Sequence, residues 1–118
     1  GYLQSIDKVY FAEGVAVTNC FTDCANLTHV IFGGVISVGK PNTNEGLNLQ
    51  WSTRLDKESI ISIFGVLSTE TNGYVVTLSK TAVNNAFGIN VDDETTFPEG
   101  SEYYTLRHSR DNWTVNYI

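Results

Sequence analysis

The chain has 118 residues, the size of one domain, of which 42% are hydrophobic and 17% are charged, and this balance predicts an ordered globular fold rather than a disordered chain. The net charge is −6 and the seven basic residues are scattered, which argues against nucleic acid or an anionic membrane surface as a partner. No apolar run reaches the ~18 residues of a membrane span, and the absence of methionine predicts a piece of a longer or processed protein.

Short strands are predicted in the first half of the chain. Residues 8–12 and 28–33 alternate apolar and polar side chains, and residues 46–52 do the same. Residues that favour turns separate these strands, above all the glycine pair at 33–34 and the polar run at 40–46. Each strand is therefore expected to bury one face.

Helices alternate with strands in the second half. The predicted elements are a helix capped by Asp56 and running to about Ser68, a strand at 74–79, a helix at 80–87 capped by Ser79, a loop at 89–100, a helix capped by Ser101 and running to about Arg110, and a strand at 113–118. Strands that alternate with helices predict parallel pairing with right-handed crossovers.

An apolar spacing of three, three and two occurs twice in the first half. A shift of 21 residues places Leu3 on Cys24, Ile6 on Leu27, Val9 on Val30 and Phe11 on Phe32. A unit with one narrow apolar edge buries that edge by stacking on copies of itself, and this shift lies within the ~20–29 residues typical of leucine-rich repeats.

The run Phe21-x-x-Cys24-x-x-Leu27-x-x-Val30-x-Phe32 resembles the repeat of BspA-like leucine-rich repeat proteins of bacterial surfaces, over roughly residues 3–52. The resemblance implies an α/β fold: a short leucine-rich-repeat solenoid with a parallel β-sheet and helical or coil crossovers on its convex side. Residues 1–118 would form a single domain, with short repeats in 1–52 and an irregular, helix-containing C-terminal part in 53–118. It also implies a non-enzymatic role in protein–protein interaction or adhesion, at the cell surface or outside the cell.

No sequence motif indicates an enzyme. The chain lacks a nucleophile elbow, a glycine-rich phosphate loop and a His-Glu-x-x-His motif. We therefore expect no catalysis and no cofactor. An active site formed by a Ser, a His and an Asp that meet by chance in the fold stays open as an alternative. Asp92, Asp93 and Glu94 lack the spacing of a calcium loop and are interpreted as a solvated loop.

Cys24 is interpreted as a small buried thiol, with a Cys20–Cys24 disulfide as the alternative, and no metal site is expected.

The outward face of the expected sheet is the predicted binding surface for a host or neighbouring-cell protein or for a glycan. Its main members are Lys8, Tyr10, His29, Ile31, Asn48, Gln50, Thr77 and Asn116, with Val75 and Thr114 beside them. The repeat makes Tyr10 and His29 diagonal neighbours within reach of one ligand group.

The N-terminal strand edge is expected to self-associate, because a preceding repeat that would cover it is missing. The alternatives to a binding module are a purely structural cap or spacer, and a carbohydrate-binding β-sandwich. The β-sandwich requires antiparallel strands, whereas the repeat fold requires parallel ones.

Overall fold

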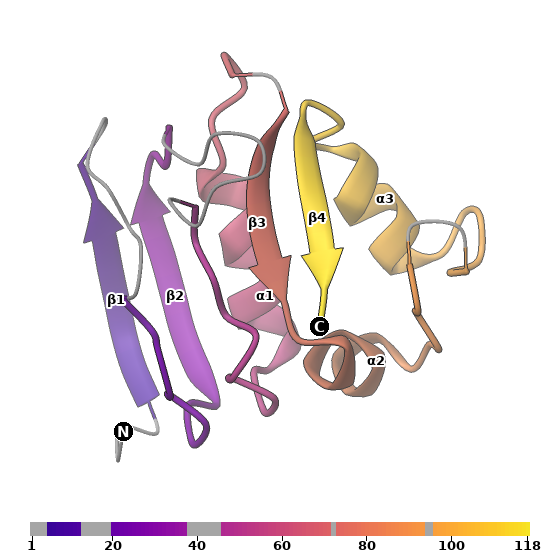
Figure 1. The fold of residues 1–118 in the computed structure, drawn as a ribbon, viewed down its shortest axis with the longest axis horizontal. Helices are drawn as coiled ribbons and strands as arrows, with labels where there is room; N and C mark the ends of the chain where they lie inside the picture. The colour runs from indigo at the N-terminus through magenta and orange to yellow at the C-terminus, as the bar shows by residue number, and fades with distance from the viewer. Residues whose placement is uncertain (1–4, 13–19, 38–45, 72, 94–95) are drawn as a thin grey trace.

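The structure, a computed structural model, describes residues 5–12, 20–37, 46–71, 73–93 and 96–118 (Figure 1). In chain order its elements are β1 (Ser5–Phe11), β2 (His29–Gly34), α1 (Lys57–Val66), β3 (Tyr74–Leu78), α2 (Lys80–Phe87), α3 (Glu102–His108) and β4 (Trp113–Tyr117).

The described strands form two separate sheets of two strands each. β1 pairs with β2 and β3 pairs with β4, and both pairs are parallel. The two sheets run in opposite directions, as the arrowheads in Figure 1 show. The β-sandwich alternative does not fit, because it required antiparallel pairs.

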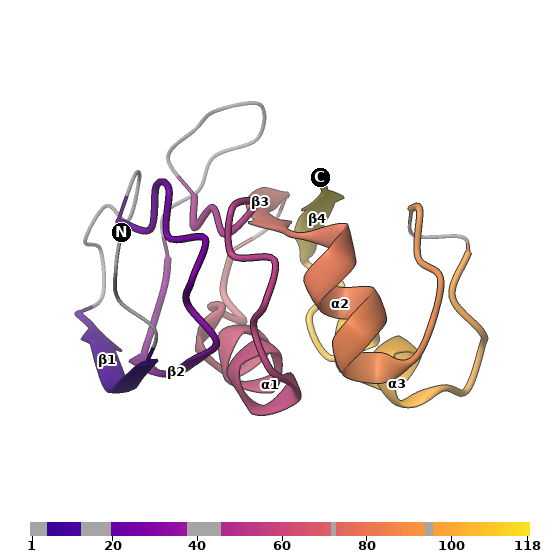
Figure 2. The ribbon, with the colours of Figure 1, turned by 90° about the horizontal axis from the view of Figure 1, so that it is seen from below.

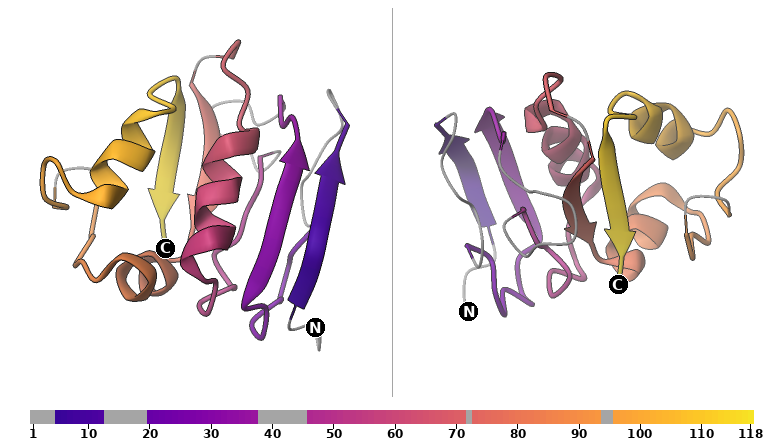
Figure 3. Two further views of the ribbon diagram at one scale, coloured as in Figure 1. Left: turned by 180° about the vertical axis from the view of Figure 1, so that it is seen from behind. Right: turned by 45° about the horizontal axis from the view of Figure 1, so that its top comes forward.

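The elements lie in two layers with the core between them. β1, β2 and α1 are side by side in one layer, and β3 and β4 lie in the other, as Figure 2 shows from below and Figure 3 from behind. Alternate residues of each strand point into this space. Val30 and Phe32 of β2 and Val76 and Leu78 of β3 are all buried in one hydrophobic core.

The predicted leucine-rich-repeat solenoid is wrong. Its sheet was expected to continue from β2 into a third strand, but helix α1 lies along that edge of β2. Ser59 and Ser62, one turn apart on α1, accept hydrogen bonds from the backbone N–H groups of Val30 (2.9 Å) and Phe32 (3.0 Å). Because these N–H groups are already bonded, β2 has no donors left there for another strand, and the sheet ends at two strands.

The third predicted strand, at 46–52, is replaced by a short extended segment and a turn. Asn48 makes a single bridge with Thr77, and its side-chain oxygen accepts a hydrogen bond from the backbone N–H of Gln50 at 3.0 Å. This local bond gives the backbone a turn in place of a strand ladder. Leu49 is fully buried, so the apolar positions of the segment still reach the core.

The predicted repeat does not give the register of the first sheet. The repeat would place Val9 beside Val30, whereas Val9 pairs with Phe32, and an irregularity separates this pair from the one between Ile6 and Val30. Register is set by which side chains face the core and by the geometry of the connecting turns, so the repeat spacing alone does not determine it. Leu3, the first position of the predicted repeat, lies outside the described residues.

The helices begin where the capping residues predict. The side chains of Asp56, Ser79 and Ser101 each accept a hydrogen bond from the backbone N–H three positions further on. α2 ends at Gly88, which adopts the left-handed conformation with φ 65°. α1 ends at Val66, slightly before the predicted end, because the chain then becomes extended.

Aromatic side chains fill the core beneath the second sheet. Tyr103 of α3 has no exposed surface, and its ring contacts those of Phe64, Phe87, Phe97 and Tyr117. Such ring pairs add stabilisation beyond the area that they bury. Within the described residues, no helix has both the length and the apolar character needed to cross a membrane.

Candidate functional site

The predicted strand-face residues do not form one surface. Lys8, Tyr10, His29 and Ile31 belong to β1 and β2, in one layer. Thr77 and Asn116 belong to β3 and β4, in the other layer, and Asn48 bridges to Thr77 there. Gln50 follows Leu49, whose N–H donates to Thr77 O. Because both sheets turn their buried sides toward a common core, their outward faces point away from each other, and one ligand cannot contact both.

Tyr10 and His29 are not neighbours either. His29 pairs with Ser5, whereas Tyr10 pairs with Gly33 at the other end of the strand. Tyr10 and Lys8 instead lie together over Gly33: a Cβ atom added to Gly33 would meet Lys8 Cε at 3.5 Å and Tyr10 Cδ2 at 3.7 Å. On the outward face of the first sheet, the Tyr10 ring and the Lys8 side chain therefore lie together over Gly33, which has no side chain.

A serine, a histidine and an aspartate do come together. His29 Nδ1 lies 2.7 Å from Asp56 Oδ2, and the Ser59 hydroxyl donates to Asp56 Oδ1 at 2.5 Å. In a nucleophilic triad the imidazole lies between the serine and the acid, whereas here the acid lies between the other two. Ser59 is also fully buried, so its oxygen has no access to a substrate. This group joins β2 to the start of α1 and is not a hydrolytic centre.

The charge of Asp56 is part of that junction. Partial burial raises the pKa of Asp56, but hydrogen bonds from Ser59 and His29, and the positive charge that His29 can carry, outweigh it and lower the pKa below its ordinary value of 3.8. Asp56 is therefore an ionised N-cap at neutral pH, and its charge is favourable at the positive end of the helix dipole.

The described cysteines and acidic loop residues are not arranged as a metal site. Cys20 and Cys24 are both free thiols, and Cys24 is only partly buried, so the prediction of a buried thiol is only partly right. In the described part of the chain, no three His, Cys, Asp or Glu side chains are placed to hold a metal ion. Asp92 and Asp93 are exposed, in agreement with a solvated loop, and Glu94 lies outside the described residues.

The outer edge of β1 is a strand edge that is open to a partner. Among the described strands, β1 pairs only with β2, so no described strand covers its other edge. The carbonyl of Phe11 accepts a hydrogen bond from Val35 on the β2 side at 3.1 Å. Backbone groups of successive strand residues point to opposite sides, so the N–H and C=O of Tyr10 point outward. Tyr10 as a whole residue is 73% exposed.

Comparison with known protein families, with curated proteins and with solved structures finds no match to this chain.

Proposed function

We propose that this chain is a non-enzymatic interaction module that binds another polypeptide along the outer edge of β1. The observation that carries the proposal is the seven-residue β1 strand, which is paired on one side only within the described residues. An unpaired strand edge presents a row of N–H and C=O groups that an added strand can satisfy.

The side chains beside this edge support binding. Tyr10 and Lys8 lie together over Gly33, and Tyr10 is largely exposed. A tyrosine provides a large contact area and a hydroxyl for little loss of conformational entropy, which is why it is enriched at interfaces. The described residues of β1 contain no proline, and the irregularity in its register lies between Ile6 and Val9. The strand around Tyr10 therefore has a regular register and keeps its backbone N–H donors.

A second copy of the chain is the partner that we assign to this edge. Two identical edges related by a two-fold axis pair as antiparallel strands and give a closed dimer. This pairing joins each two-stranded sheet into one of four strands. A sheet of three or more strands with a hydrophobic face is more stable than an isolated pair, so dimerisation strengthens the first sheet.

Two substitutions at one position test the proposal. Tyr10→Pro removes the outward N–H, which is tolerated at a strand edge that faces solvent. Tyr10→Ala removes the same ring but keeps the N–H. Sedimentation velocity over a concentration series should show dimerisation of the native chain, weaker dimerisation of Tyr10→Ala, and a monomer for Tyr10→Pro.

Hydrogen exchange then locates the contact. In the native chain, the Tyr10 amide should become more protected as protein concentration rises, while the Val30 amide, bonded to Ser59, stays protected throughout and reports an intact fold. A native chain that stays monomeric at millimolar concentration, or a Tyr10→Pro variant that dimerises like the native chain, would overturn the proposal.

A further inference from the structure

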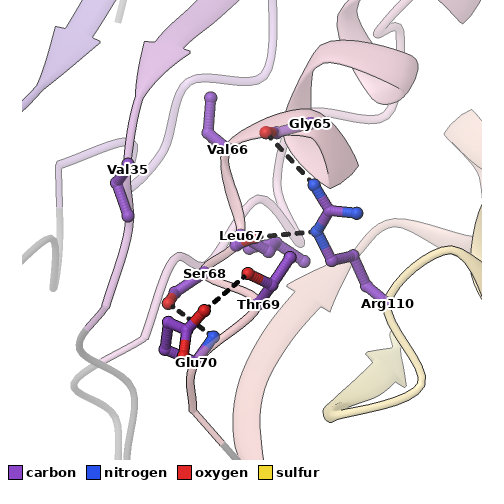
Figure 4. A pocket seen from close by; sticks show the side chains of 8 residues that line it. All are labelled: Val35, Gly65, Val66, Leu67, Ser68, Thr69, Glu70 and Arg110. Atoms are coloured by element: carbon purple, nitrogen blue, oxygen red, sulfur yellow. Dashed lines mark hydrogen bonds between the residues drawn. The ribbon is translucent and has the colours of Figure 1, made fainter.

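A cavity of about 250 Å³ lies where three parts of the chain meet (Figure 4). Val35, just after β2, forms one side, and residues 65–69, at and just after the end of α1, form the floor. Arg110, in the turn between α3 and β4, lies at one end and Glu70 at the other. Val35 is 38% exposed, so an apolar side chain faces the opening.

The guanidinium of Arg110 is held in place by backbone carbonyls. Its Nε–H donates to Leu67 O at 2.8 Å, Nη1 donates to Ser109 O at 2.8 Å, and Nη2 lies 3.5 Å from Gly65 O. A guanidinium has five N–H donors, so two remain. None of the ion pairs among the described residues involves Arg110. A fixed positive charge with spare donors therefore stands in the cavity wall.

Glu70 supplies a negative charge on the other side of the same cavity. Its carboxylate is exposed and, among the described residues, accepts one long hydrogen bond, 3.4 Å, from the Thr69 hydroxyl. Figure 4 shows Arg110 and Glu70 at opposite sides, with Leu67 and Thr69 between them. The cavity thus has a cationic end, an anionic end and apolar surface from Val35.

We propose that this cavity binds a small zwitterion of the amino-acid or dipeptide class, with its carboxylate on Arg110 and its ammonium group on Glu70. A planar guanidinium matches a carboxylate through two parallel hydrogen bonds. The volume is below the ~300–1,000 Å³ of sites for drug-sized ligands, so a small ligand fits it. A multiply charged anion such as phosphate is opposed by the Glu70 carboxylate and by the negative end of the α1 dipole.

A titration followed by NMR tests the site, with glycylglycine as the probe. It should produce saturable shifts at the amides of residues 67–70 and at the Arg110 side chain. Arg110→Gln and Glu70→Gln should each weaken binding about tenfold, the size expected for a lost hydrogen bond to a charged group. Acetate, which has no ammonium group, should bind about tenfold more weakly than glycylglycine.

Glu58→Gln is the matched control. Glu58 is an exposed carboxylate in the first turn of α1, at the opposite end of the helix from the cavity, and it does not line the cavity. This variant makes the same change of charge as Glu70→Gln and should bind glycylglycine within about twofold of the native chain. Glu70 is exposed, so Glu70→Gln tests the site without unfolding the chain. No saturable shift, equal binding of acetate, or unchanged binding by Glu70→Gln would overturn the proposal.

Discussion

The two sheets end in different ways where they approach the middle of the molecule. The edge of β2 bonds to the hydroxyls of Ser59 and Ser62 on α1. The edge of β3 bonds to the backbone instead: Leu49 N–H donates to Thr77 O and Thr77 N–H donates to Leu47 O, both at 2.9 Å. A backbone partner survives a change of side chain, whereas a serine partner does not. The first sheet therefore depends on individual residues at its edge in a way that the second does not.

The packing beneath the two sheets differs as well. In the N-terminal part, Phe32 contacts two rings, stacking on Phe11 at 5.6 Å and meeting Phe21 edge-on at 5.5 Å. In the C-terminal part, Tyr103 contacts four rings at once. We expect the C-terminal part to be most sensitive in its core, and the N-terminal part to be most sensitive at its edge and in its backbone.

Tyr103→Ala should have the largest effect. The side chain is fully buried among four rings, and truncation of a buried aromatic to alanine costs ~3–5 kcal/mol of unfolding free energy. Tyr103→Phe keeps the ring and removes the hydroxyl, which lies 2.8 Å from the Tyr117 hydroxyl, so it should cost about 1 kcal/mol. Urea unfolding measures both, and equal costs would place the stabilisation in the hydroxyl pair rather than in packing.

Gly34→Ala should be the next largest, because it strains the backbone of the first sheet. Gly34 has φ 84°, and an added Cβ atom would overlap the carbonyl oxygen of Phe11. The conformational strain alone is worth ~1–3 kcal/mol. At the neighbouring Gly33 an added Cβ makes only ordinary contacts, so Gly33→Ala should change stability by less than about 0.5 kcal/mol. Thermal unfolding of the two variants should separate them, and similar melting temperatures would contradict the observed register.

Ser59→Ala tests the side-chain edge of β2. It removes the acceptor for the buried Val30 N–H, and an unsatisfied buried donor costs ~1–3 kcal/mol. Thr77→Ala at the edge of β3 keeps both backbone hydrogen bonds, so it should cost less than about 1 kcal/mol. Urea unfolding compares the two edges directly. A larger cost for Thr77→Ala would reverse the contrast between them.

Asp56→Asn should have the smallest effect, visible as a change in pH dependence. Asn remains a good N-cap, but it does not titrate. The pKa of Asp56 is lower in the folded state than its ordinary 3.8, so its ionised form stabilises the fold fully above that value. The contribution is lost as pH falls through the lowered pKa. The melting temperature of the native chain should therefore approach that of Asp56→Asn as pH falls below about 4, and a constant difference between them would show that Asp56 contributes no linked charge.

Local signals in the sequence predicted several elements correctly. The capping residues Asp56, Ser79 and Ser101 mark the helix starts because a cap needs only a side-chain oxygen and an N–H three positions away. The alternation in β2 and β3 assigned Val30 and Val76 to the core for a similar reason: a strand turns successive side chains to opposite faces whatever it pairs with.

The two proposed binding sites depend on contacts that the sequence does not reveal. Tyr10 and Lys8 were predicted on an outward face, but their position over Gly33 follows from a register that only the strand pairing shows. Arg110 and Glu70 were missed, because they lie far apart in the sequence and no local pattern links them.

The sequence by itself determined where helices start, which strand positions are buried and that the chain lacks known catalytic motifs, because each depends on a few adjacent residues. The tertiary structure decided that α1 lies along β2, that the strands form two sheets in opposite layers, and that the expected binding face is divided between them. The physical reason is that a strand edge accepts any geometrically suitable donor or acceptor. The hydroxyls of Ser59 and Ser62 on α1 accept hydrogen bonds from the Val30 and Phe32 N–H groups of β2, and the sheet ends at that edge.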